Sequence, residues 1–308
     1  MAEARPIKRP PDSFVYVSLL PEYAECTTLH ACDLQPLAKS LADLDRVSRR
    51  IQADRQAPLS IERTLARYLT DNAAARQELF AATACRLTAY MPPGDGRLEE
   101  MTQHSSFDEA VSVLPMSPVE TLDLERLTDL SRRVKGDPQL QLRRRGLRTV
   151  PDSQGASIVF PPAEAAIARA ATVCAAYTAC RGPADLCLAV WVLAALLNAH
   201  PCPDGNGRLS RLLFAGVLTR MGLTHAPVFA LGPLVHASRG AFEIAVRRVG
   251  VQGRWQPLVD LLAVYADYLA KHLPKVVALS AGDVQFVEER SMTDRVLIST
   301  TGERPCVT

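Results

Sequence analysis

The stretch HPCPDGNGRLSR, residues His200–Arg211, follows directly on LCLAVWVLAALLNA, residues Leu186–Ala199. The apolar segment is the longest of its kind in the chain and is too short to cross a bilayer, so it is predicted to be a buried helix. Pro201 and Pro203 cannot continue that helix, and DGNG permits the left-handed dihedral angles that glycine and asparagine adopt most easily. A new helix is predicted to begin near Gly207. A densely polar loop therefore lies between two apolar helices.

The polar residues of this loop are of the types that bind a nucleotide and a metal ion. Free N–H groups at a helix start form an anion site, and Arg208 and Arg211, one turn apart, add charged donors for phosphate oxygens. Asp204 offers a hard oxygen ligand for Mg²⁺, which prefers one or two carboxylates together with substrate phosphates. His200 supplies a base that titrates near neutral pH. The loop is predicted to hold a nucleotide–Mg²⁺ complex and to move a proton beside it.

Other interpretations of the loop fit less well. DGNG alone is a common turn, and a single histidine at a helix end is more often a cap or a core residue than a base. An EF-hand would need an oxygen ligand where Arg208 stands and a glutamate where Ala215 stands. A Walker A loop would need a Lys-Ser/Thr pair. The joint spacing of histidine, aspartate, glycines and two arginines is hard to obtain from packing alone and favours a functional loop.

Composition and charge bound the class of protein. The chain has 308 residues, 48% hydrophobic and 22% charged, with a formal net charge of +2. These values are typical of one large or two ordinary globular domains, and they do not indicate nucleic acid or an anionic membrane as a partner. Arg143–Arg145 and Arg148 form a basic cluster that we interpret as a solvated loop rather than a phosphate or nucleic-acid contact. The sequence shows neither a recognition helix nor a basic stripe, which argues against a DNA-binding regulator.

The lack of a recognisable signal peptide and the pattern of cysteines predict a cytoplasmic protein. Residues 1–23 contain no apolar run long enough for a signal peptide, and no transmembrane span follows. The eight cysteines are scattered without zinc-site spacing, so reduced thiols are expected. Delivery into another cell without an N-terminal signal stays open.

Periodicity predicts a mainly α-helical chain with one small hairpin. Residues 1–35 form an irregular lead-in, 36–110 a helical region of unknown role, and 276–308 a tail without strong pattern. A helix is predicted to begin after Ser117. Ser117 would be its N-cap, and Glu120 would complete a capping box. Leu147–Phe160 contains two β-prone segments around a turn at Asp152–Gly155. The remaining helices are predicted at Ala163–Cys180, Leu186–Ala199, Leu209–Met221, around Gly240–Val249, and at Gln256–Leu273.

The loop resembles the signature of the Fic (Fido) family, H-P-F-x-[DE]-G-N-G-R-x-x-R, at every position except Cys202, where phenylalanine is usual. The hairpin and the FPP that ends it, residues 160–162, resemble the family's flap. TLDLERLTDLSRRV, residues 121–134, is similar to the helix before the flap, and residues 237–269 to the closing helices. In that last segment Phe242 and Leu258 replace a usual tyrosine and tryptophan. The resemblance spans about residues 117–272. It implies a Fic-type helical bundle with a small β-hairpin flap at 111–275, preceded by the N-terminal helical region.

The resemblance implies a protein adenylyltransferase, which transfers AMP from Mg²⁺-bound ATP, its co-substrate, to a serine, threonine or tyrosine hydroxyl of a target protein. His200 would be the general base, and Asp204 would hold the Mg²⁺. The implied nucleotide-binding residues are Gly205, Asn206, Gly207, Arg208 and Arg211. Ile158, Val159 and Phe160 of the flap would hold the target backbone by strand addition.

Two alternatives remain within this resemblance. Relatives use UTP or another phosphodiester donor; in the phosphate-transferring branch a lysine typically replaces Gly207, which argues against that branch here. The second alternative is a weakly catalytic adaptor with the Fic fold. Its main support is Cys202, because a small residue in place of phenylalanine leaves the loop looser unless larger neighbours fill the space.

Many family members carry an inhibitory helix, [ST]-x-x-x-E-[GN], whose glutamate pairs with the second motif arginine, here Arg211. No complete copy occurs in this sequence. Two partial copies, Ser105–Glu109 and Thr121–Glu125, are followed by alanine and arginine instead of glycine or asparagine, so their Glu109 and Glu125 are weak candidates. An inhibitory partner protein is the other possible source of restraint.

Overall fold

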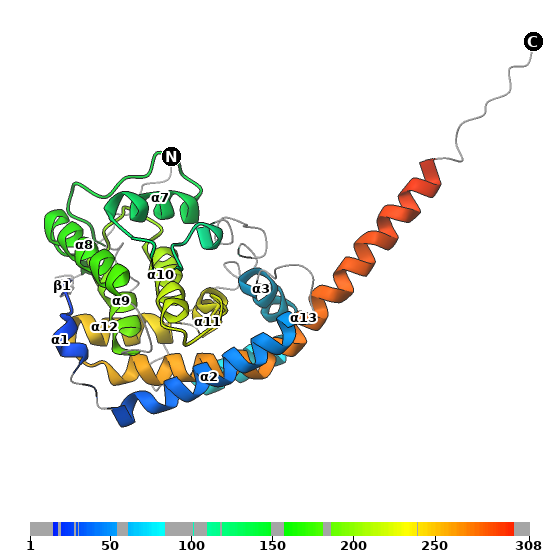
Figure 1. The fold of residues 1–308 in the computed structure, drawn as a ribbon, viewed down its shortest axis with the longest axis horizontal. Helices are drawn as coiled ribbons and strands as arrows, with labels where there is room; N and C mark the ends of the chain where they lie inside the picture. The colour runs from blue at the N-terminus through cyan, green and yellow to red at the C-terminus, as the bar shows by residue number, and fades with distance from the viewer. Residues whose placement is uncertain are drawn as a thin grey trace, which may run out of the picture.

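The computed structural model describes residues 15–17, 20–27, 29, 31–53, 61–83, 101, 110–117, 119–148, 157–180, 186–238 and 240–298. Within these ranges the fold is mainly α, as predicted (Figure 1). The helices are α1 (Tyr23–Cys26), α2 (Ala31–Ala53), α3 (Ile61–Asp71), α4 (Ala73–Thr83), α7 (Leu124–Lys135), α8 (Ala163–Ala179), α9 (Leu186–Ala199), α10 (Asn206–Arg220), α11 (Leu231–Ala237), α12 (Ala241–Gln252) and α13 (Gln256–Ile298). Two short strands, β1 (Val15–Val17) and β2 (Ser157–Val159), make up the sheet.

Helix α9 lies at the centre of the bundle, as its sequence predicts. It packs against α8, α10 and α12, and its side chains, Trp191 among them, are almost all buried. A helix that is apolar on every side is stable only when neighbours cover the whole of its surface. The end of α9, where the polar loop begins, is therefore held in place by the core.

The N-terminal helical region packs against the closing helix of the chain. Helix α2 runs alongside α13 (Figure 1), burying Leu37, Leu41 and Leu44 at helical spacing. Helix α2 also contacts the segment after α10: Asp45 Oδ1 accepts a hydrogen bond from the backbone N–H of His225 and lies 2.7 Å from its ring Nδ1. The first and last parts of the sequence thus build one face of the bundle together.

The flap hairpin is confirmed at its base. Arg148 forms an antiparallel bridge with Val159, and the Phe160 N–H donates to Leu147 O at 2.9 Å. The predicted turn, Asp152–Gly155, lies outside the described residues. On its other edge β2 pairs in parallel with β1, in the register Tyr16 to Ile158.

The expectation of an irregular lead-in over residues 1–35 is wrong where the structure describes it. Strand β1, helix α1 and the start of α2 all fall within it. Val-Tyr-Val has a high strand propensity, but three residues form a strand only when a partner is present. That partner, β2, is more than 140 positions away in the sequence, so local spacing could not reveal the pairing.

Three further helix predictions need correction. The helix before the flap begins at Leu124 with Asp123 as N-cap, whose carboxylate accepts the Arg126 N–H at 2.8 Å. Ser117 is therefore not the cap, although its N–H does donate to the Glu120 carboxylate, within a turn. Helix α11 was not predicted, and α13 continues well past Leu273, into the stretch expected to be a patternless tail.

Among the described residues, no helix has the length and apolar character needed to cross a membrane. The described thiols of Cys26, Cys174, Cys180, Cys187 and Cys202 are buried and reduced.

Candidate functional site

The polar loop is a tight, internally bonded connection between α9 and α10. His200 ends α9 in the left-handed region, with φ of 52°, and Gly205 caps α10 with φ of 80°. The side chain of Asn206 closes the loop: its Nδ2 donates to Cys202 O at 2.7 Å and its Oδ1 accepts the Cys202 N–H at 2.9 Å. The nucleotide-binding role that the resemblance implies for Asn206 concerns its backbone amide, and these side-chain contacts leave that amide at the start of α10.

The ring of His200 is mostly buried and has a defined orientation. It stacks on Phe160, with ring centroids 4.0 Å apart and planes at 21°. Nδ1 lies 3.0 Å from Leu197 O. Since a carbonyl can only accept, this contact requires the proton on Nδ1 and leaves the lone pair on Nε2. In this orientation Nε2 is the ring nitrogen that can accept a proton.

The environment of His200 favours the neutral ring. Burial lowers its pKa to about 4, and the cationic side chains of Arg247 and Arg143 act in the same direction. The Leu197 carbonyl and the Asp204 carboxylate oppose the shift. At neutral pH the ring can therefore accept a proton.

Asp204 presents one exposed carboxylate to the start of α10. Its Oδ2 forms an ion pair with Lys135 at the end of α7, and its Oδ1 accepts the Gly205 N–H at 2.6 Å. The hydrogen bond from Lys135 is the main reason that the pKa of Asp204 is lowered. In the described part of the chain, no cluster of three or more His, Cys, Asp or Glu residues could hold a metal ion. A lone carboxylate fits Mg²⁺ that is held jointly with substrate phosphates, provided that Lys135 moves away.

The two arginines of the motif lie on the first turns of α10. Arg208 is half-buried, whereas Arg211 is only 7% exposed. A Cβ at Gly207 would lie 3.3 Å from Arg211 Nη1, so a side chain there would crowd the guanidinium. Within the described residues, Arg211 Nε has no hydrogen-bond partner. A buried cationic donor of this kind suits an anionic ligand at the helix start.

The flap residues are placed unequally around the loop. Ile158 and Val159 are half-buried on β2, whereas Phe160 is buried between His200 and Arg247, whose guanidinium carbon lies 5.5 Å from the Phe160 ring centroid. Phe160 therefore supports the imidazole directly. Both edges of β2 at Val159 are paired within the chain itself, with β1 and with Arg148.

Residues 121–218 match the family model described as Fic/DOC family. The chain carries a Fic/DOC domain. This domain contains the whole polar loop, and its family indicates a transferase that moves a nucleotide-derived group to a target. The catalytic assignments for individual residues stay predictions.

Solved structures of Fic proteins are similar in fold. A Fic family protein from Desulfovibrio desulfuricans G20 superposes with a TM-score of 0.50 at 13% identity, covering 78% of this chain and 74% of that one. Residues 134–508 of Fic-1 from C. elegans give a TM-score of 0.45 at 17% identity, covering 83% and 76% of the two chains. The first likeness supports the Fic/DOC fold. No curated protein matches the chain.

The structure reveals an acidic neighbour of the Fic/DOC loop that sequence reasoning missed. Glu62 on α3 is 8% exposed, and its charge, followed by that of Glu243, counteracts the burial that lowers the pKa of Arg211. Of the two glutamates considered from sequence, Glu109 lies outside the described residues and Glu125 is exposed on the first turn of α7. No motif marks Glu62, because its position depends on how α3 packs on the domain.

Cys202 occupies the buried position of the Fic/DOC loop where phenylalanine is usual. Its side chain is fully buried, and Sγ lies 3.3 Å from Oγ of Ser131 on α7. Burial raises the pKa of this thiol, so it is a poor nucleophile. The thiol is a packing residue between the loop and α7.

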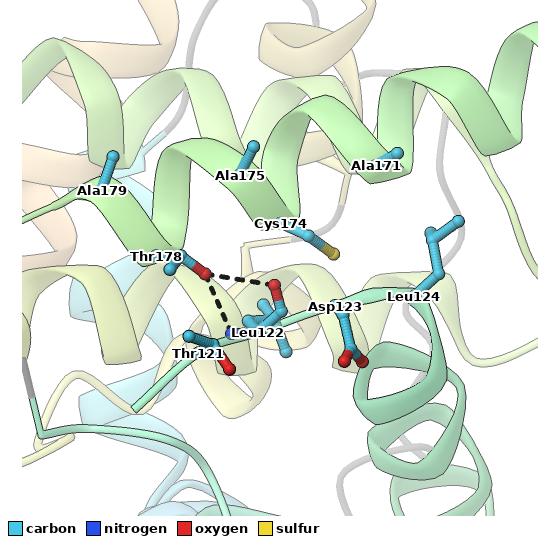
Figure 2. A pocket seen from close by; sticks show the side chains of 9 residues that line it. All are labelled: Thr121, Leu122, Asp123, Leu124, Ala171, Cys174, Ala175, Thr178 and Ala179. Carbon is cyan, nitrogen blue, oxygen red and sulfur yellow. Dashed lines mark hydrogen bonds between the residues drawn. The ribbon is translucent and has the colours of Figure 1, made fainter. Parts of the chain in front are cut away.

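A cavity of about 840 Å³ lies elsewhere on the Fic/DOC domain, between residues 121–124 and α8 (Figure 2). Thr178 Oγ1 accepts the Leu122 N–H and donates to the Leu122 carbonyl, which holds the extended segment against α8. Burial raises the pKa of Cys174 in this cavity to about 12. A thiol with that pKa stays protonated, and the other lining residues offer little chemistry.

Proposed function

We propose that this protein transfers AMP from Mg²⁺-bound ATP to a serine, threonine or tyrosine hydroxyl of a target protein. The observation that carries the proposal is the arrangement of His200: its Nδ1 lies 3.0 Å from Leu197 O and burial lowers its pKa to about 4, and it ends α9 in the loop that leads into α10, the helix that bears Arg208 and Arg211. A base, an anion-binding helix start and two guanidinium groups are the parts that nucleotidyl transfer requires.

In the proposed reaction His200 Nε2 accepts the proton of the target hydroxyl. The hydroxyl oxygen forms a bond to the α-phosphorus of ATP, and the bond from that phosphorus to the oxygen bridging to the β-phosphate breaks. Pyrophosphate leaves with the electron pair of that bond, and AMP stays on the target as a phosphodiester. The imidazolium then returns its proton to solvent or product.

The residues around the helix start would bind the triphosphate. The amides of Asn206 and Gly207 belong to the first turn of α10, where backbone N–H groups have no acceptor within the helix. The Gly205 N–H donates to the Asp204 carboxylate in this structure. It would become available to a phosphate if that carboxylate bound a metal ion instead. Arg208 and Arg211 would bind the phosphates of the departing pyrophosphate.

Mg²⁺ would be held by Asp204 and would neutralise charge on the phosphates when bound. Lys135 pairs with that carboxylate. Because Asp204 is exposed and Lys135 only half-buried, the pair is weak and exchangeable.

The flap would hold the target as an extended segment beside β2. One edge of β2 pairs with Arg148 of the same hairpin, and the other with β1. A target strand would therefore take the edge that β1 holds, which requires β1 to leave.

The test is labelling of protein by purified full-length chain with Mg²⁺ and α-³²P-ATP, α-³²P-UTP or γ-³²P-ATP, alone and in a lysate. The expected result is label from α-³²P-ATP only, lost in His200→Ala and reduced about 100-fold in Arg208→Ala. Arg144→Ala, which removes an exposed arginine outside the loop, should label normally. Label from UTP alone would move the assignment to another donor, and label from none, with ATP still bound, would indicate the adaptor.

A further inference from the structure

Arg143 departs from the solvated loop that the sequence predicts for Arg143–Arg145. Arg144 and Arg145 are exposed, whereas Arg143 is 4% exposed. Its guanidinium lies between the polar loop and the flap and contacts both. Every one of its nitrogens donates to a backbone carbonyl.

Nη1 of Arg143 donates to Arg145 O in its own segment, and the other three carbonyls that its side chain binds belong to the end of α9 and to the flap. Nε donates to His200 O at 2.7 Å, and Nη2 to Ala199 O at 3.1 Å. Nη2 also donates to Pro161 O at the end of the flap. The last carbonyls of a helix lack partners within the helix and carry partial negative charge, so a buried cation there is well compensated.

The backbone of Arg143 adds a further contact to the same loop, because its N–H donates to Pro201 O at 2.9 Å. His200, between the two carbonyls contacted at Ala199 and Pro201, is the one non-glycine residue with positive φ among those described. Such a conformation costs about 1–3 kcal/mol and persists only where surrounding contacts fix it. Arg143 alone donates hydrogen bonds to the three consecutive carbonyls of Ala199, His200 and Pro201 that span this turn.

We propose that Arg143 is the positioning residue of this active site, which holds His200 in its left-handed turn and couples that turn to the flap through Pro161. Among the described residues the hydrogen bonds of Arg143 go to the end of α9, the polar loop, the flap and its own segment, and none goes to α10. Its contact with the base is therefore made through the backbone. The guanidinium fork is rigid and makes several bonds at once. A lysine can replace its charge but not its geometry.

The proposal is tested with Arg143→Gln, Arg143→Lys and the matched control Arg144→Gln in the full-length chain. The rate measurement rests on the proposed function: kcat in Arg143→Gln should fall about 100-fold, because displacement of a catalytic group by about 1 Å has effects of that size. The KM for ATP should change less than about twofold, since the phosphate-binding groups lie on α10. Arg143→Lys should recover part of kcat, and Arg144→Gln should match the wild type.

A second readout does not depend on activity. Long-range ¹H–¹⁵N spectra of the imidazoles, with the His200 signals assigned from His200→Gln, report which ring nitrogen is protonated. The wild type should show the Nδ1–H tautomer that Leu197 O imposes, and Arg143→Gln a mixture of tautomers. Melting temperatures identify any variant that fails to fold, in which case Arg143→Lys decides.

The outcomes separate the two proposals. An unchanged tautomer with unchanged kcat, in Arg143→Gln or, if that variant is unfolded, in Arg143→Lys, would overturn the role of Arg143. A rise in KM for ATP with kcat unchanged would also overturn it, because it would indicate direct nucleotide binding. If the wild type transfers no nucleotide, the proposed function fails, and the tautomer measurement still decides whether Arg143 positions the imidazole.

Discussion

Glu62 of α3 is the acidic side chain that acts most strongly on the buried guanidinium of Arg211. A carboxylate beside this cation reduces the positive potential available to phosphates. We predict that Glu62→Gln binds ATP on the order of fivefold more tightly, about 1 kcal/mol, in isothermal titration calorimetry. The same change leaves a buried cation less compensated, so the melting temperature should fall by about 2–4 °C.

Glu125→Gln is the control for this prediction, since Glu125 is exposed on α7. Its ATP affinity should equal that of the wild type. Weaker ATP binding in Glu62→Gln would show that Glu62 supports the arrangement of Arg211 rather than competing with phosphate.

The depressed pKa of His200 predicts a reaction that is insensitive to mild acid. A base with a pKa of about 4 is neutral from pH 8 down to pH 5, so the rate should be flat over this range and halve near pH 4. The measurement is the labelling rate against pH at saturating ATP. An acid limb near pH 6.5 would mean that the imidazole is exposed to solvent and not buried under Phe160.

The same group links stability to pH. The pKa of His200 is about 4 in the folded chain and about 6.5 in an unfolded chain, so the unfolded chain binds the extra proton between these values. The free energy of unfolding should therefore decrease by about 3 kcal/mol from this residue as the pH falls from 7 to 4. Urea unfolding of wild type and His200→Gln, compared at both pH values, isolates the contribution. Parallel pH dependences in the two proteins would contradict it.

Local patterns in the sequence revealed the parts of the site that are continuous in the chain. The apolar run of α9, the glycines and prolines of the loop and the start of α10 follow from residue type and spacing, and the structure places them as predicted. Glu62, Arg143 and β1 enter the site from distant positions. Their roles depend on how α3, the segment before the flap and the N-terminal strand pack, and a single sequence does not contain that information. Arg143 in particular has the same local sequence as its exposed neighbours.

Because Lys135 pairs with Asp204, we predict that it competes with Mg²⁺ for the Asp204 carboxylate. In Lys135→Met the carboxylate no longer pairs with an ammonium group, so the Mg²⁺ concentration that gives half-maximal labelling should fall. Asp204 is exposed and Lys135 half-buried, which limits the effect to about 1 kcal/mol, or about fivefold. The effect should shrink at high salt. Lys271→Met, which breaks a similarly exposed pair with Glu78, is the control. A higher Mg²⁺ requirement in Lys135→Met would assign Lys135 to phosphate binding.

We predict that a phenylalanine, the residue usual at position 202, does not fit between the loop and α7 in this protein. The side chain is fully buried and in contact with Ser131, so Cys202→Phe should lower the free energy of unfolding by about 1–3 kcal/mol through overpacking. Urea unfolding measures this change, and Cys202→Ala, which adds no volume, should lose about 1 kcal/mol. A more stable Cys202→Phe protein would show that the loop retains room for the larger residue.

Because β1 pairs with β2, we predict that it blocks the edge of the flap at which a target would bind. Its parallel pairing with β2 covers the edge at which a target strand would add, and the following segment is anchored nearby, where Trp191 Nε1 donates to Pro21 O at 3.0 Å. Proline removes the backbone N–H that pairs with a neighbouring strand. A Tyr16→Pro/Val17→Pro double variant should therefore release the edge and increase target labelling severalfold.

The matched control is Tyr16→Ala/Val17→Ala, which changes the same side chains but keeps both N–H groups and should label more slowly than the proline variant. Hydrogen exchange of the β2 amides shows whether the edge has opened. If those amides exchange faster in the proline variant while labelling does not rise, targets do not dock at this edge of β2, because an opened edge offers them the donors and acceptors that strand addition requires.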